Sequence, residues 1–141
     1  MTREELEAFR KAYQKAAKKS VKAKNGKGRA IDEQSDWVWF DRESIQQILD
    51  MTDPKEGGIK IYLGQYDKKN INMLPKEMRE KHDYVGKVSL ALVACNKTKE
   101  EFEDIYSDTL VDSEKDLKSQ RSDGGISPLN AGNVCPPICK P

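Results

Sequence analysis

The sequence predicts an α+β fold, in which helices pack against a small antiparallel sheet. A basic helix precedes this core in the chain, and an irregular tail follows it. Three observations support this class. The chain has 141 residues, about the size of one globular domain. Segments with the three- to four-residue periodicity of helices flank two segments that alternate as strands do. The end of the chain, residues 107–141, is rich in Pro, Gly and Ser and has only scattered apolar positions.

Charge divides the chain into two parts. The formal net charge is only +1, but residues 1–30 hold ten basic and three acidic side chains, so the rest of the chain is acidic. We therefore expect a basic amphipathic helix and linker at 1–30 and a small α+β domain with the C-terminal tail at 31–141. Such charge asymmetry indicates a basic arm that docks on an acidic surface, either the chain's own acidic body or that of a partner.

The first helix is expected from about Thr2 to Val21. Thr2 and Glu5 have the spacing of a capping box, in which each side chain bonds a free backbone N–H at the start of a helix. One narrow apolar stripe then recurs at helical steps: Leu6, Phe9, Tyr13, Ala16 and Ala17. Beyond the helix, residues 24–36 contain turn formers without periodicity, which predicts a flexible link.

The second helix is expected over residues 42–51. Asp41 is a good N-cap, and Phe40 and Ile45 have the spacing of a hydrophobic staple. The preceding segment, residues 36–40, is short and aromatic. We interpret it as an extended segment whose two Trp rings lie on the core.

Two strands are expected, near 59–66 and 86–95, and they should pair antiparallel. The second strand is apolar on both faces, which is typical of an interior strand. We expect the helix at 42–51 to lie across the faces that carry Ile61 and Leu63 of the first strand and Leu90 and Leu92 of the second. A short helical turn should follow Pro75, and the capping-box spacing of Thr98 and Glu101 predicts a last, acidic helix over 98–106.

Four runs of sequence stand out together: WFDRESIQQIL, GGIKIYLGQY, VGKVSLALVAC and the ending NAGNVCPPIC. In these runs the chain resembles a family of small uncharacterised bacterial proteins. The shared pattern is an aromatic residue and Asp before a helix, a G-I-(K/R)-I-Y strand, a second apolar strand and a Cys-Pro-Pro-x-Cys tail. The family has no assigned activity, so the resemblance implies no catalytic residue. It does imply that the tail is an integral part of the protein, and we expect residues 130–139 to pack back on the domain.

The cysteines and the single histidine raise the question of metal or thiol chemistry. Cys95, Cys135, Cys139 and His82 could form a Cys3His zinc site, but only one close ligand pair exists, at C-x3-C. We therefore predict no metal and no cofactor. The N-terminus lacks an apolar signal segment, so we expect a cytoplasmic protein with reduced thiols. In an oxidising compartment, the stiff Pro-Pro unit could instead hold Cys135 and Cys139 close enough for a disulfide. A small metal or thiol protein built on the three cysteines remains an alternative.

The sequence favours a binding role over an enzymatic one. A nucleophile would need a tuned base, and His82 is the single histidine. No phosphate-binding glycine motif and no apolar run long enough to span a membrane is present. We predict a non-catalytic protein-interaction or assembly module that binds a protein partner or forms a homo-oligomer. The alternative is a nucleic-acid-associated protein that uses residues 1–30. The predicted partner-binding residues are the anchors Leu6, Phe9 and Tyr13 and the steering lysines Lys18 and Lys19.

Overall fold

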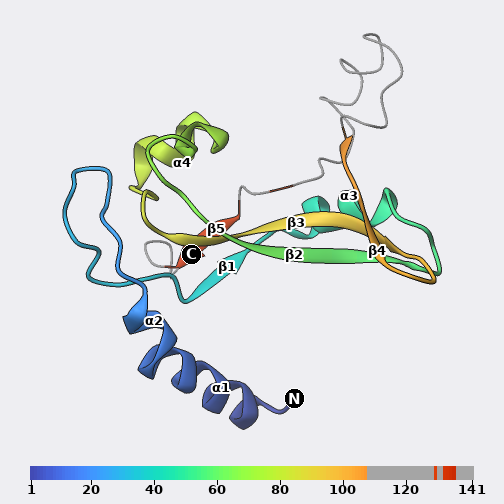
Figure 1. Ribbon diagram of the computed structural model, residues 1–141, viewed down its shortest axis with the longest axis horizontal. Helices are drawn as coiled ribbons and strands as arrows, with labels where there is room; N and C mark the ends of the chain where they lie inside the picture. The colour runs from blue at the N-terminus through green and yellow to red at the C-terminus, as the bar shows by residue number, and fades with distance from the viewer. Residues whose placement is uncertain (108–128, 130–131, 136–141) are drawn as a thin grey trace. The chain divides into compact units, whose positions relative to one another are not determined.

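The computed structural model describes residues 1–107, 129 and 132–135. It confirms the α+β class, with helices and two small sheets (Figure 1). The chain divides into two compact units. Within the described part, the first unit comprises residues 1–39, 64–89 and 133–135, and the second comprises 40–63 and 90–107 with 129 and 132. No helix among the described residues is long and apolar enough to cross a membrane.

The N-terminal helical segment forms as predicted, although it is broken once. Helix α1 spans Arg3–Lys15 and helix α2 spans Ala17–Ser20. Both hydrogen bonds of the predicted capping box are present at the start of α1, from the Thr2 N–H to Glu5 Oε2 at 2.6 Å and from the Glu5 N–H to Thr2 Oγ1 at 3.2 Å. At Ala16 the backbone leaves regular helical geometry, with φ −117° and ψ −79°.

The link after α2 is ordered, contrary to the expectation of a flexible segment. Asn25 Oδ1 accepts hydrogen bonds from the N–H groups of Lys27 and Arg29, which closes a tight turn. A bridge between Lys24 and Ala30 follows from this turn. Local side-chain to backbone bonds of this kind order a segment that has no apolar periodicity.

Gly86 allows the link, residues 24–36, to pack closely against the start of the strand that begins at Val88. Its φ is +83°, and a Cβ atom there would lie 2.5 Å from the carbonyl oxygen of Lys24 and 2.4 Å from Ile31 Cδ1. The buried Gln34 then hydrogen-bonds this strand through both ends of its amide, to the Gly86 carbonyl at 2.9 Å and from the Val88 N–H at 2.8 Å. A segment predicted to be a linker is therefore part of the first unit's interior.

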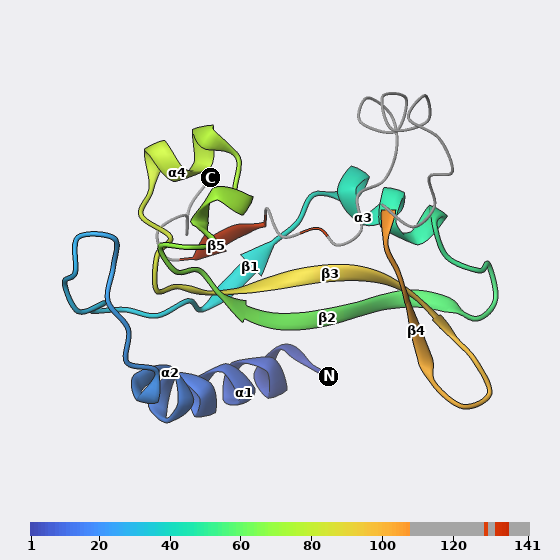
Figure 2. The same ribbon diagram turned by 45° about the horizontal axis from the view of Figure 1, so that its top comes forward.

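Strands β1 (Trp37–Trp39) and β5 (Asn133–Cys135) form a two-stranded antiparallel sheet (Figure 2). Val134 lies opposite Val38 and is fully buried. The prediction that the tail packs back is thus confirmed for residues 133–135, while residues 130, 131 and 136–139 lie outside the described residues. The prediction that both Trp rings lie on the core is wrong. Trp37 and Trp39 share the exposed face of this short strand, because successive side chains alternate and Val38 takes the inner side.

The second unit packs helix α3 (Arg42–Asp50) on a three-stranded sheet. Asp41 caps α3 as predicted, accepting the Ser44 N–H at 2.7 Å. Ile48 on α3 is fully buried against Leu92 and Ala94 of the sheet. Both members of the predicted staple, Phe40 and Ile45, are partly buried around this core. The other partly buried residues there are Met51, Ile59, Ile105 and Leu129.

The three strands are β2 (Gly57–Gln65), β3 (Val88–Lys97) and β4 (Phe102–Ile105), in the order β2-β3-β4 (Figure 1). The predicted antiparallel pair is confirmed, because β3 lies beside β2 and backbone bonds at their opposite ends link Glu56 to Lys97 and Tyr66 to Lys87. The central position of β3 explains why it is apolar on both faces.

The predicted packing of the helix is confirmed at Leu92 of β3, but the prediction that it also covers Ile61 and Leu63 of β2 is wrong. Helix α3 contacts the Ile59 end of β2, whereas Ile61 and Leu63 are 58% and 81% exposed. Lengths explain this. A helix of nine residues is about 14 Å long, whereas a strand of nine residues is about 30 Å long, so α3 cannot cover all of β2.

The predicted helix at 98–106 is also wrong, since these residues form a tight turn and strand β4. The Glu101 N–H donates to Thr98 Oγ1 at 3.0 Å, as in a capping box, but the Thr98 N–H bonds the Glu101 carbonyl and closes a hairpin turn. The same short-range side-chain bond serves both structures, and tertiary pairing with β3 decides between them. The helical turn predicted after Pro75 is present as α4 (Lys76–Lys81), and the 3-10 turn η1 (Ile71–Met73) precedes it.

Candidate protein-interaction site

The C-terminal half of α1 is held on its own unit by polar contacts. Arg10 Nη2 donates to Asp36 Oδ2 at 2.8 Å, and Gln14 Nε2 donates to Asp36 Oδ1 at 3.1 Å. The Tyr13 hydroxyl donates to the carbonyl oxygen of Ser35 at 2.7 Å. We call Arg10, Tyr13 and Gln14 with their acceptors the α1 clamp.

Asp36 is the charged centre of the α1 clamp. Burial opposes ionisation of its carboxyl group, but the hydrogen bonds from Gln14 and Arg10 and the charge of Lys18 outweigh burial and lower its pKa below the usual value. Lys18 also lies 3.0 Å from Glu33 Oε1. Two members of the basic arm, Arg10 and Lys18, are therefore neutralised by acids of the same chain.

The predicted anchors separate into two groups. Tyr13 and Lys18 bind the chain's own segment 33–36, so the structure uses them internally. Leu6 and Phe9 remain 46% and 67% exposed, in the half of α1 that precedes the clamp. Lys19 is exposed and lines a shallow hollow of about 350 Å³ with Lys18, Gln14 and residues 32–34. Their predicted role in partner binding remains a prediction.

The residues considered for zinc do not come together in the described structure. No group of three or more His, Cys, Asp and Glu side chains with metal-binding proximity occurs among these residues. Cys95 is a buried free thiol, and the His82 ring lies edge-to-face on Tyr84. Cys135 is disulfide-bonded, in contrast to the expected reduced thiol. Cys139 lies outside the described residues.

A polar cluster that the sequence did not predict lies on the second unit. Asp104 on β4 accepts a hydrogen bond from the Tyr62 hydroxyl at 2.5 Å and from the Tyr106 hydroxyl at 3.2 Å. Its other oxygen, Oδ1, lies 2.5 Å from Lys60 Nζ. We call these four residues the Asp104 cluster. The period-two alternation of β2 placed Lys60 and Tyr62 on one face, but the acidic partner was hidden by the incorrect helix prediction for 98–106.

The Asp104 cluster keeps each group in its ordinary charge state. Hydrogen bonds from Lys60 and Tyr62 lower the pKa of Asp104, and the bond to Asp104 raises the pKa of Lys60 and of both tyrosines. A general acid or base works best with a pKa near neutrality, and these shifts move every group away from it. The cluster therefore suits a fixed ion pair better than proton transfer.

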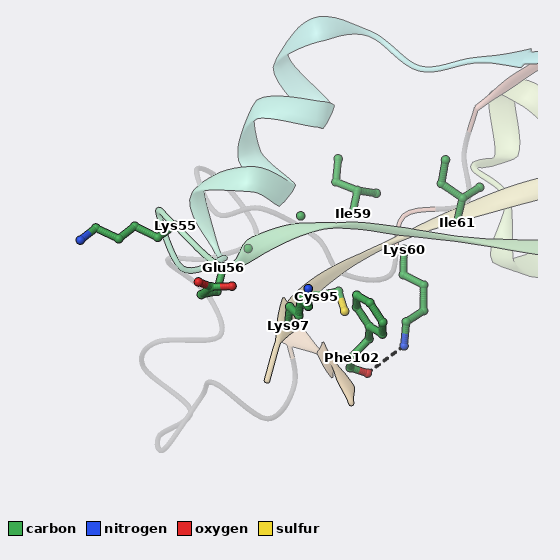
Figure 3. Close-up of a pocket in the computed structure, with 10 residues that line it drawn as sticks. Lys55, Glu56, Ile59, Lys60, Ile61, Cys95, Lys97 and Phe102 are labelled. Atoms are coloured by element: carbon green, nitrogen blue, oxygen red, sulfur yellow. Dashed lines mark hydrogen bonds between the residues drawn. The ribbon is translucent and has the colours of Figure 1, made fainter. Parts of the chain in front are cut away.

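An open hollow of about 590 Å³ adjoins this cluster (Figure 3). The Phe102 ring lies beside the Cys95 sulfur, and Lys60 points toward the Phe102 carbonyl, which accepts its ammonium hydrogen bond at 3.0 Å. Gly58 leaves one wall open, because a Cβ atom there would meet no atom within 4 Å. The rim mixes Lys55 and Lys97 with Glu56. Since Lys60 is already paired, these charges favour no particular ligand.

No family model, curated protein or solved structure matches this chain. The resemblance to the family with the Cys-Pro-Pro-x-Cys tail therefore stays a prediction.

Proposed function

We propose that this chain is a non-catalytic protein-interaction module and that the N-terminal half of α1 is its binding surface. One observation carries the proposal: the α1 clamp holds the helix at Arg10–Gln14 and leaves Leu6 and Phe9 uncovered. Apolar anchors at three- and four-residue steps are what an amphipathic helix inserts into a hydrophobic groove.

The clamp supports this role because it presents the helix in a defined position. A helix of 13 residues is marginally stable alone, and binding it would then require ordering it. The clamp supplies that order in advance, which reduces the entropic cost of association. The pKa directions in the Asp104 cluster support a role without acid–base chemistry.

The nucleic-acid alternative has less of the basic arm available to it. Arg10 pairs with Asp36, and Lys18 pairs with Glu33, so these two cations already have acidic partners. Lysines such as Lys11 and Lys15 remain exposed on α1. They could steer an acidic protein surface toward the helix.

The test compares two double variants of the full chain as bait in extracts of the native cell. Leu6→Ala with Phe9→Ala removes the anchors, and Lys11→Ala with Lys15→Ala is the matched control on the same helix. We expect a protein that binds the wild type stoichiometrically to lose at least tenfold in affinity with the first variant, because buried anchor residues dominate interface energetics. The lysine control should mainly slow association and reduce its salt dependence.

Circular dichroism should show both variants folded, since all four side chains are exposed. The proposal is wrong if the Leu6/Phe9 variant binds every captured protein as the wild type does. If the lysine variant abolishes binding to random-sequence DNA and the Leu6/Phe9 variant changes nothing, the nucleic-acid alternative replaces it.

A further inference from the structure

Strand β2 has one unpaired edge in the described structure, because it is the outer strand of the order β2-β3-β4. The backbone bonds that join β2 to β3 set its register. The Lys97 N–H donates to the Glu56 carbonyl at 2.8 Å, and the Tyr66 N–H donates to the Lys87 carbonyl at 3.2 Å. Both strands advance ten residues between these two bonds, so the register is continuous along β2.

This register shows which backbone groups face the open edge. In an antiparallel pair, alternate residues direct both backbone groups to the partner strand and the others direct both away. Residues 58, 60 and 62 therefore bond β3, whereas Ile59, Ile61 and Leu63 direct their N–H and C=O groups outward. The edge ends at Gln65, whose carbonyl accepts a hydrogen bond from Asn70 Nδ2 at 3.0 Å.

The open edge lacks the features that normally prevent edge-to-edge pairing. Proteins protect such edges with proline, bulges or unpaired charges. β2 contains no proline, and its single charged residue, Lys60, is neutralised by Asp104 of the same chain at 2.5 Å. The side chains along the edge are apolar and exposed at Ile61 and Leu63.

We propose that β2 of a second copy of this chain pairs with this edge in an antiparallel, two-fold symmetric register centred on Ile61. Ile61 then lies opposite Ile61 of the second copy, and Ile59 lies opposite Leu63. All these residues have outward-facing backbone groups, so each pair exchanges two hydrogen bonds. The result is one continuous sheet with the order β4-β3-β2-β2-β3-β4. The proposed edge lies in the second unit and uses none of the residues of the α1 surface proposed above.

Charge and side-chain contacts fit this register. Lys60 lies opposite Tyr62 of the second copy, so no like charges face each other directly. Each Lys60 also keeps its own Asp104. On the opposite face, Ile59, Ile61 and Leu63 of both copies form one apolar row, in which cross-strand contacts partly shield the two exposed side chains, Ile61 and Leu63, from water.

Neighbouring two-fold registers fit less well. An axis at Tyr62 pairs Ile61 with Leu63 but places Ile59 opposite Gln65, whose carbonyl already accepts a hydrogen bond from Asn70. An axis at Ile59 leaves Leu63 without a partner. An axis at Leu63 requires the Gln65 carbonyl, which Asn70 already occupies.

Pairing through one strand buries less than the roughly 800 Å² per partner of a stable interface. We therefore expect reversible dimerisation, with a dissociation constant in about the micromolar range.

Sedimentation of the full chain over a concentration series measures this equilibrium. The wild type should shift from monomer to dimer as concentration rises. Leu63→Lys should weaken the dimer at least tenfold, because it places a charge in the apolar row of both copies. Leu63 is 81% exposed, so this variant should keep the wild-type melting temperature. Met73→Lys is the matched control, since Met73 is similarly exposed on η1 and should leave the dimer unchanged.

Cysteine crosslinking tests the register directly. In the proposed dimer the two Ile61 Cα atoms lie about 5.5 Å apart, within disulfide range. Ile61→Cys should therefore form a disulfide-linked dimer under mild oxidation. Leu63→Cys should not, because the two Leu63 positions are about 13 Å apart. Wild type treated in the same way measures crosslinking by the native cysteines.

A wild type that remains monomeric up to millimolar concentration overturns the proposal. So does a dimer that Leu63→Lys leaves intact, or one in which Leu63→Cys crosslinks and Ile61→Cys does not. These outcomes leave the α1 proposal standing, because that proposal is tested with different residues.

Discussion

At the scale of single residues, one carboxylate organises the exposed face of the second unit. Asp104 accepts both tyrosine hydroxyls and pairs with Lys60. Its lowered pKa means that its stabilising effect is complete above the usual carboxyl pKa and is lost as pH falls through the lowered value. The raised pKa of Lys60 sets the upper pH limit of this stabilisation, since the contribution of Lys60 to stability is lost as pH rises through the raised value. The cluster is therefore intact across the neutral range.

We predict that Asp104→Asn lowers the pKa of Tyr62 and Tyr106 toward the usual tyrosine value of about 10. The reason is that the negative charge which opposes phenolate formation is removed. Titration by the ultraviolet absorbance of phenolate measures this, and Tyr62→Phe identifies which part of the change belongs to Tyr62. Glu103→Gln is the control, because Glu103 is the preceding residue of β4 and points to the other face. An unchanged titration in Asp104→Asn would show that these hydroxyls do not bond the carboxylate in solution.

At the scale of elements, the α1 clamp replaces the apolar docking that usually fixes a surface helix. No residue of α1 is buried, so polar contacts to Ser35 and Asp36 hold it. Hydrogen bonds to a charged group are stronger than neutral ones, contributing about 1.5–3 kcal/mol each in favourable settings. The position of α1 should therefore depend on the charge of Asp36.

We predict that α1 is released as pH falls through the lowered pKa of Asp36, and that Asp36→Asn releases it at neutral pH. The sign follows from linkage: protonation removes the charge that Arg10, Gln14 and Lys18 stabilise, so the contribution exists above the usual carboxyl pKa and is lost below the lowered one. Amide hydrogen exchange of residues 3–15 should accelerate while strands β2 and β3 stay protected. Asp32→Asn is the control, because Asp32 is exposed on the same segment. Equal protection of α1 in wild type and Asp36→Asn would contradict the role of the clamp.

At the scale of the whole molecule, the pairing of β1 with β5 joins parts of the chain that are about a hundred residues apart. Closing such a long loop has a large entropic cost, which the contacts made there must offset. Val134 supplies a fully buried side chain at this junction.

We predict that Val134→Ala lowers the free energy of unfolding by about 2 kcal/mol, from lost burial and the cavity left behind. For a chain of this size the melting temperature should fall by roughly 5 °C. Val21→Ala, at an exposed valine, should change it by less than about 1 °C. Thermal unfolding measures both, and equal melting temperatures would mean that β5 does not contribute to stability in solution.

Local chemistry determined much of this protein from sequence alone. The capping box at Thr2, the N-cap at Asp41, the two strands and the α+β class follow from side-chain bonds and periodicities that act within a few residues. Where two structures share the same local bond, sequence could not choose between them. The Thr98 bond to Glu101 suits a helix start or a hairpin turn, and pairing with β3 selected the turn.

Tertiary structure alone decided which surfaces stay open. Periodicity placed Ile61 and Leu63 on an apolar face, but whether that face is covered depends on the length and position of α3. The stripe of α1 likewise included Tyr13, yet Tyr13 became a clamp residue because Ser35 folds against it. Whether a side chain is exposed depends on which other segment packs against it, and that segment usually comes from a distant part of the sequence.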